Sequence, residues 1–153
     1  MNRSLFARGI TFSILHPGLV AGVIPYVLVS ETPLRAESIP VYGAILIMLG
    51  SVVLITCIYQ FGTQGKGTLS PLDPTKVLVT EGIYRYTRNP MYVSVMTILV
   101  GECLMFASRT LIIYAVAVLI GFHQFILFHE EPRLKKVFGQ AYIDYAKKVR
   151  RWI

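Results

Sequence analysis

The chain has 153 residues, of which 54% are hydrophobic and only 15% are charged, and its mean hydropathy is +0.59. About a quarter of the residues of a soluble domain are charged, so this composition excludes an ordinary soluble domain and also a disordered chain. The two cysteines, Cys57 and Cys103, lie within apolar runs and form neither a disulfide framework nor a metal-ligand pattern. The length fits one domain, and the composition indicates a small integral membrane protein.

Four apolar runs with almost no charged residues predict four membrane-spanning helices. Their approximate bounds are residues 9–30, 41–61, 90–108 and 110–129. A helix needs about 20 apolar residues to cross the hydrocarbon core, and a helix satisfies its own backbone hydrogen bonds there. The first run is too long for the apolar part of a signal peptide, so we interpret it as a retained helix. The predicted fold class is all-α integral membrane, with one domain over residues 1–153.

Two local features refine this prediction. Pro17 and Pro25 predict kinks in the first helix, because proline lacks a backbone donor. The third and fourth helices are joined by only a few residues near Ser108 and Arg109, which predicts an antiparallel hairpin.

The basic residues indicate an orientation. Of the 15 lysines and arginines, 13 lie before the first helix, in the loop over residues 62–88 or after the fourth helix. The positive-inside rule therefore places both termini and this loop in the cytoplasm, and we expect the protein in the cell inner membrane. Because the charges border the apolar runs and do not form one basic domain, nucleic-acid binding is disfavoured.

The segments outside the apolar runs contain the informative motifs. The loop over residues 62–88 is rich in glycine and proline, which indicates irregular backbone, and it lacks the G-x-G-x-x-G order of a Rossmann site. The tail over residues 132–150 has an apolar stripe at spacings of three and four, formed by Leu134, Phe138, either Ala141 or Tyr142, Tyr145 and Val149. This spacing predicts an amphipathic helix that lies on the membrane surface. Docking on the membrane alone is one interpretation, and the two tyrosines together with the acidic pair at its start favour a helix that also closes a site.

Charged residues mark the two ends of the expected hairpin. At the start of the third helix, Asn89 is a possible N-cap, Pro90 suits the first turn, and Arg88 adds positive charge where a helix N-terminus can hold a carboxylate. At the end of the fourth helix, Glu130 and Glu131 oppose the helix dipole, so they require a compensating cation. Arg88 or a cationic ligand would meet that need, and the sequence leaves both alternatives open.

The order Tyr84-x-x-x-Arg88-Asn89-Pro90-x-Tyr92, followed by Glu130-Glu131 and the tyrosines of the tail, resembles the isoprenylcysteine carboxyl methyltransferase family and related membrane phospholipid methyltransferases. The resemblance covers about residues 65–152. It implies a methyltransferase that uses S-adenosylmethionine and releases S-adenosylhomocysteine, with Arg88 and Glu130 as catalytic residues. It also implies the cofactor-binding residues Lys76, Val77, Leu78, Val79, Tyr84, Asn89, Pro90, Met91, Tyr92, Glu130 and Glu131.

The function expected from these features is methyl transfer to a lipid or other amphiphilic small molecule that carries a carboxylate or an amine. Ile126 stands where eukaryotic prenylcysteine enzymes carry an arginine, which disfavours prenylcysteine as the acceptor. His123 and Gln124 precede Glu130 by about two turns and are candidates for either the methyl-donor or the acceptor pocket. Two alternatives are a sterol-type, NADPH-dependent membrane reductase, which the short chain disfavours, and a non-catalytic membrane adaptor.

Overall fold

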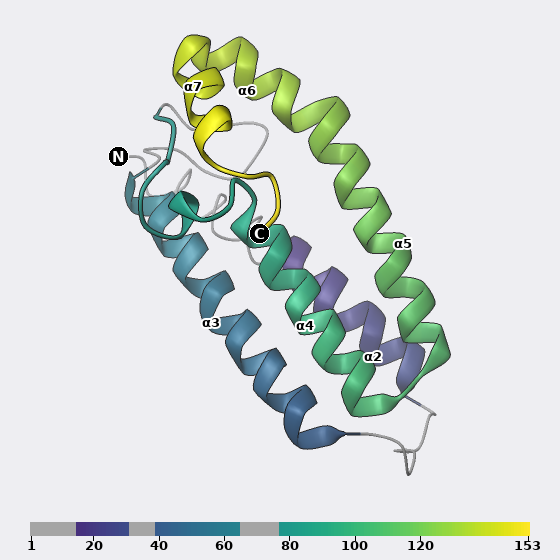
Figure 1. Ribbon diagram of the computed structural model, residues 1–153. Coiled ribbons are helices and arrows are strands. Elements are labelled where there is room, and N and C mark those ends of the chain that lie inside the picture. Colours follow the sequence, from purple (N-terminus) through teal and green to yellow (C-terminus); the bar gives the residue numbers. More distant parts are fainter. Residues whose placement is uncertain (1–14, 31–38, 65–76) are drawn as a thin grey trace.

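The computed structural model describes residues 15–30, 39–64 and 77–153, and within these ranges the chain is helical and contains no strand. Four helical segments run side by side (Figure 1). They are Leu15–Val29, which includes the π-helix η1 (Leu19–Val23) and α2 (Ile24–Val29); α3 (Pro40–Gln64); α4 (Pro90–Phe106); and a run of α5 (Arg109–Phe125), the π-helix η3 (Ile126–Glu130) and α6 (Glu131–Phe138).

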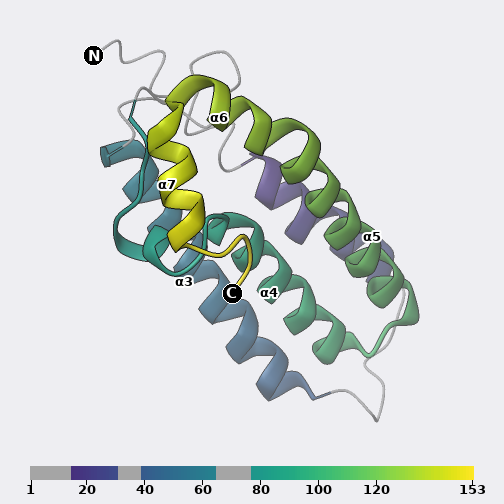
Figure 2. The same ribbon diagram turned by 45° about the horizontal axis from the view of Figure 1, so that its top comes forward.

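One end of this bundle is covered by the remaining elements, and we call it the loop end. Here α7 (Gln140–Lys148) folds back from α6 toward the start of α4, beside the 3-10 helix η2 (Gly82–Arg85) (Figure 2). The starts of α4 and α7 and the ends of α3 and α5 therefore gather at the same end of the molecule. The opposite end holds the short α4–α5 connection.

Two of the helical stretches are long and apolar enough to cross a membrane, Pro40–Phe61 and Arg109–Phe138. The other two, Leu15–Val29 and Pro90–Phe106, are apolar but shorter, and the 17 residues of α4 extend over about 26 Å. The run Arg109–Phe138 has 30 residues and extends over about 45 Å, more than the ~30 Å hydrocarbon core, so its turns from His129 onward lie beyond the apolar part. Four complete crossings remain a prediction.

Glycines bring α3 and α4 into very close contact. A Cβ atom added at Gly43 would lie 2.6 Å from the carbonyl oxygen of Gly101, and one added at Gly101 would lie 2.7 Å from the carbonyl oxygen of Gly43. Gly50 lies two helical turns further along α3, and a Cβ added there would lie 2.8 Å from the carbonyl oxygen of Ser94. Small residues at such positions allow backbones to approach, which is how apolar helices associate in a membrane.

The first segment is kinked next to Pro25, as the sequence predicts. Inside η1 the residue Ala21 leaves helical geometry, with φ of −112° and ψ of 24°, and the Ile24 amide donates to the carbonyl of Leu19. The carbonyl of Val20 is thereby freed from its usual helical partner, and the hydroxyl of Tyr114 on α5 donates to it at 2.8 Å. The kink therefore attaches the first segment to α5.

The α4–α5 hairpin is present, and its connection is one residue longer than the expected bounds of 90–108 and 110–129 imply. α4 ends at Phe106 and α5 begins at Arg109, so only two residues connect them. Ala107 adopts a left-handed φ of 47°, and its amide donates to the carbonyl of Cys103. Val95 and Leu99 on α4 pack against Ala115 on α5 in the core between the two helices.

The tail differs from the single helix expected over residues 132–150. α6 continues directly from η3, and the helix is interrupted at Gly139, whose φ of +53° suits glycine. α7 then runs back over the loop end, with Tyr142 and Tyr145 buried. The residues of the predicted apolar stripe are the less exposed positions of both helices, so the periodicity identified the inner face correctly.

Candidate active site

The two ends of the hairpin meet at the loop end, as the sequence predicts. The hydroxyl of Tyr92, in the first turn of α4, donates to Oε2 of Glu130 at 2.8 Å. Next to this contact, Nη1 of Arg88 lies 3.2 Å from Oε1 of Glu131. Residues from the start of α4 and from the end of η3, about forty positions apart in the chain, therefore form one polar cluster.

A cavity of about 580 Å³ opens beside this cluster, and we call it the first cavity. Its volume lies within the range of small-molecule sites. Its lining is mainly apolar and aromatic, with a few polar side chains at the loop end. The lining residues are His16, Pro17, Val20, Phe61, Tyr84, Arg88, Asn89, Pro90, Met91, Tyr92, Val95, Phe122, Phe125 and Glu130.

The start of α4 offers hydrogen-bond donors to this cavity. Asn89 occupies the N-cap position of α4, as the sequence predicts, but its side chain does not cap the helix, because its amide donates to the carbonyl of Arg151 at 3.0 Å. The backbone N–H groups of Met91 and Tyr92 in the first turn consequently lack a capping partner. Nε of Arg88, a residue that also lines the cavity, is buried and has no partner among the described residues. This combination suits an anionic group.

Glu130 brings a carboxylate to the same cavity. The only side-chain hydrogen bond it accepts among the described residues comes from Tyr92. Burial raises the pKa of Glu130 above its ordinary value of 4.5, although the hydrogen bond from Tyr92 and the charge of Arg133 oppose this shift. A carboxylate in such a place gains from a cationic or hydroxyl-bearing ligand, because either restores the solvation that burial removed.

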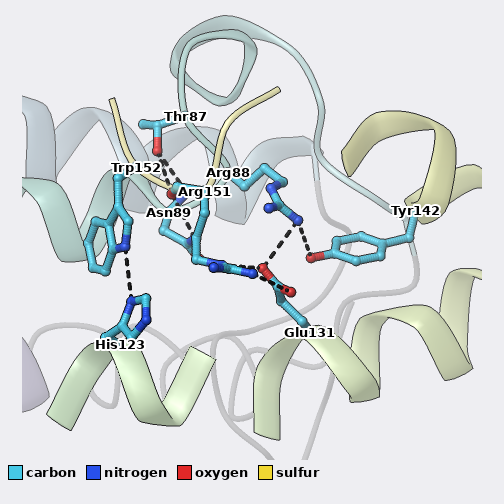
Figure 3. A network of polar contacts seen from close by, with 8 residues as sticks. All are labelled: Thr87, Arg88, Asn89, His123, Glu131, Tyr142, Arg151 and Trp152. Carbon is cyan, nitrogen blue, oxygen red and sulfur yellow. Dashed lines mark hydrogen bonds and ion pairs between the residues drawn. The ribbon is translucent and has the colours of Figure 1, made fainter. Parts of the chain in front are cut away.

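Glu131 has different surroundings from its neighbour (Figure 3). Its side chain is only 10% exposed and does not line the first cavity. Nε and Nη2 of Arg151 donate to it at 2.7 and 3.1 Å, and Arg88 forms the third contact. Burial alone would raise the pKa of Glu131, but the Arg151 hydrogen bond and the charges of Arg88 and Arg151 outweigh it and lower the pKa.

Three consecutive residues after α7, which we call the strap, connect this cluster to the rest of the bundle. The strap consists of Arg150, Arg151 and Trp152. The amide of Arg88 donates to the carbonyl of Arg150 at 2.9 Å, and the hydroxyl of Thr87 donates to the carbonyl of Arg151 at 3.0 Å. The strap thus pairs with the residues that precede α4, and Figure 3 shows Arg151 and Trp152 reaching from this side toward Glu131 and His123.

Comparison with known proteins identifies the family of the chain. The family model of phospholipid methyltransferases matches residues 39–141, about two thirds of the chain. The chain belongs to the phospholipid methyltransferase family. The matched region begins at α3 and includes α4, α5, η3 and α6, so it contains both ends of the hairpin that form the first cavity.

A curated relative also matches. Protein-S-isoprenylcysteine O-methyltransferase B of Arabidopsis thaliana is 29% identical over 109 residues, which are 71% of this chain and 55% of that protein. The aligned stretch is therefore little more than half of the plant protein's length. No solved structure matches the chain.

In this methyltransferase-family chain, the structure gathers most of the predicted site residues around one cavity. Those that line the first cavity are Tyr84, Arg88, Asn89, Pro90, Met91, Tyr92 and Glu130. Val77 is exposed, Leu78 is half-buried and Val79 is buried, and none of the three lines this cavity. Lys76 lies outside the described residues. No group of three metal-ligating side chains occurs in the described ranges.

Sequence reasoning missed the aromatic walls of the site. Phe61 comes from the end of α3, and Phe122 and Phe125 come from the last turns of α5. The ring of Phe122 packs against Tyr92 with centroids 4.7 Å apart. Phe122 and Phe125 precede Glu130 by eight and five positions, and this spacing could have indicated that they lie near Glu130. The sequence does not distinguish apolar residues that line a cavity from those that face lipid, so the spacing was not used.

Proposed function

We propose that this protein transfers the methyl group of S-adenosylmethionine to an amphiphilic acceptor in the membrane, and that the methyl donor binds in the first cavity. The family supports methyl transfer in general, and the cavity supports this particular donor. The observation that carries the proposal is that one cavity is lined both by a helix start with an unpartnered, buried Nε of Arg88 and by the carboxylate of Glu130, which forms no ion pair among the described residues.

The charged groups of the cavity suit the amino-acid end of this donor. Its carboxylate would accept from Nε of Arg88 and from the free amides of Met91 and Tyr92. Its ammonium group lies on the adjacent carbon, so its partner must be close to the same helix start. Glu130 meets this requirement, because it is hydrogen-bonded to the side chain of Tyr92.

The aromatic walls suit the rest of the donor. The rings of Tyr92 and Phe122 line the cavity with an angle of 59° between their planes, and tyrosine faces attract a positively charged sulfur. Phe61 and Phe125 add flat apolar surface for an adenine. When bound, the donor would supply an activated methyl group for in-line displacement, and the protein contributes by aligning the two reactants and by excluding water.

The in-line displacement of the methyl group requires an acceptor with a free electron pair. A carboxylate acceptor can attack the methyl carbon directly, whereas an ammonium group must first lose its proton. We further propose that the loop end faces the cytosol, because 13 of the 15 basic residues lie, in the sequence, before the first apolar run, between the second and third or after the fourth. The water-soluble donor would then reach the first cavity from the cytosol, and the acceptor would come from the bilayer.

Calorimetric titration of the purified protein with S-adenosylhomocysteine tests the proposal. We expect binding, and we expect Glu130→Gln to weaken it by about tenfold or more, since a charge-assisted hydrogen bond contributes ~1.5–3 kcal/mol. Glu81→Gln is the matched control, because Glu81 is exposed and does not line the cavity. Incubation of membrane extracts with methyl-labelled donor then identifies the acceptor, since base releases label from an ester and not from an amine.

Two results would contradict the proposal. Binding of NADPH in place of S-adenosylhomocysteine would favour a reductase. If neither S-adenosylhomocysteine nor NADPH binds, and adding the protein leaves the methylation of extracts unchanged, an adaptor would be favoured.

A further inference from the structure

A second cavity of about 810 Å³ lies in the same part of the molecule and shares no lining residue with the first. Its walls come from α3, α4, α5, the strap and the residue that follows the strap. The lining residues are Leu46, Val93, Met96, Thr97, Val100, Leu119, Ile120, His123, Gln124, Trp152 and Ile153. Neighbouring residues such as Tyr92 and Val93, or Phe122 and His123, line different cavities, so the α4–α5 pair separates the two.

We propose that this second cavity binds one hydrocarbon chain of a bilayer amphiphile, whose hydrogen-bond-accepting, anionic head group lies at His123 and Gln124. The proposal concerns binding alone and does not depend on methyl transfer. It rests on the shape of the cavity, on the distribution of its polar groups and on the charges at its end.

The cavity is elongated along the helices. Val93 and Val100 are seven residues apart on α4, which corresponds to about 10 Å along the helix axis. Leu46 on α3 continues the wall at the deep end, because the neighbouring Ile47 packs against Gly101. The one polar side chain along this stretch, Thr97, donates its hydroxyl to the carbonyl of Val93 at 2.8 Å. The wall is therefore apolar over about 10 Å, about two thirds of one bilayer leaflet of ~15 Å.

Only the end of the cavity beside the strap is polar. Nε1 of Trp152 donates to Nδ1 of His123 at 3.3 Å, and the two rings stack with an interplanar angle of 18°. Because an indole N–H can only donate, Nδ1 is an acceptor here, and the proton of the neutral imidazole is carried by Nε2. His123 therefore offers a donor to a ligand, and the amide of Gln124 offers further donors.

The charges around this end complement an anionic head group. The two nearby carboxylates face other partners, since Glu130 accepts from Tyr92 and Glu131 is enclosed by arginines. The strap contributes the positive charge of Arg150, an exposed residue, directly before Arg151 and Trp152. A head group that accepts hydrogen bonds and carries negative charge is favoured over an ammonium group.

The protein contains a built-in reporter, because Trp152 is its single tryptophan and lines this cavity. The purified full chain in detergent is titrated with stearate brominated in mid-chain, since bromine quenches tryptophan on contact. We expect a loss of fluorescence that saturates and that unbrominated stearate reverses. Stearylamine should displace the brominated chain less well than stearate does, and Gln124→Ala should reduce this difference.

A matched pair of substitutions tests the location. Val100→Phe fills the cavity and should raise the apparent Kd for stearate by about tenfold, ~1.4 kcal/mol. Val116→Phe is the control, since Val116 is an exposed position of α5 that lines neither cavity. Binding of S-adenosylhomocysteine, measured on the same samples, should be unchanged in both variants.

Three outcomes would overturn the inference. Quenching that does not saturate, or that is equal in the two variants, would mean that the chain meets Trp152 only in the micelle. Better displacement by stearylamine than by stearate would refute the anionic head group. A change of oligomeric state in Val100→Phe would assign the cavity to a second copy of the chain. Failure of S-adenosylhomocysteine binding alone would refute the proposed function and leave this site intact.

Discussion

Glu130 and Glu131 are adjacent in the sequence but should respond oppositely to the same substitution. Glu131 accepts three contacts from Arg88 and Arg151, and its side chain is 10% exposed. In Glu131→Gln, an amide N–H₂ group replaces one acceptor oxygen and faces the guanidinium donors. Breaking a buried ion pair costs about 3–5 kcal/mol. Because the Arg151 side chain is 29% exposed, water screens part of the loss, and we expect about 2–3 kcal/mol.

That loss corresponds to a decrease in Tm of about 5–10 °C for a chain of this size. Glu130→Gln should leave Tm nearly unchanged, since the glutamine oxygen can still accept from Tyr92 and burial already disfavours the ionised carboxyl. The binding of S-adenosylhomocysteine should show the reverse order, with the larger loss in Glu130→Gln.

Thermal unfolding followed by Trp152 fluorescence measures the first effect, because this residue belongs to the strap that Glu131 holds. Calorimetric titration measures the second effect on the same samples. Equal changes in Tm for the two variants would refute the division of roles between the two glutamates. So would a loss of ligand affinity in Glu131→Gln at temperatures where the protein is folded.

Three further predictions follow from the structure. Gly43→Ala should lower the free energy of unfolding by about 1–3 kcal/mol, because its Cβ would meet α4. Gly121→Ala should raise the free energy of unfolding by up to ~1 kcal/mol through helix propensity, because nothing lies within 4 Å of its Cβ. Chemical denaturation of both variants compares them. Affinity for S-adenosylhomocysteine should rise with pH above 4.5, the ordinary pKa of a glutamate, and level off once Glu130 is ionised. The reason is that only the carboxylate attracts the ammonium group. A pH-independent affinity of the wild type, or a pH dependence retained in Glu130→Gln, would contradict this. Glu102→Gln should leave Tm unchanged or raise it, since Oε2 of Glu102 is buried without a partner among the described residues; a clear decrease in Tm would reveal an unrecognised contact of this carboxyl.

The elements at the loop end show which structural features the sequence predicted and which it did not. The tail stripe with Tyr142 and Tyr145 identified the buried face, since its spacing reflects helix geometry alone. The sequence could not show that Gly139 would turn the chain, because glycine is tolerated inside many helices. The Tyr145 hydroxyl then donates to the carbonyl of Tyr84 at 2.7 Å, and burial raises the pKa of Tyr145 to about 12. This long-range contact attaches α7 to η2.

The role of Gln60 was equally hidden. Its side-chain oxygen accepts from the amide of Ile83 at 3.3 Å, next to Gly82, whose φ of +63° and close contact with Gln60 leave no room for a Cβ. Their contact depends on how α3 and α4 pack, which no local pattern encodes.

The amino-acid order by itself determined the helical class, the positions of the apolar segments, the hairpin and the family resemblance, because hydropathy, spacing and proline act over short stretches of chain. Tertiary packing decided which of two adjacent glutamates faces a cavity and which is enclosed by Arg88 and Arg151. The π-turn of η3, in which the Glu131 amide donates to Ile126 and not to the next carbonyl, rotates the following residues away from a regular helical register. Such a rotation is set by contacts between distant elements, and so it is absent from any periodicity in the sequence.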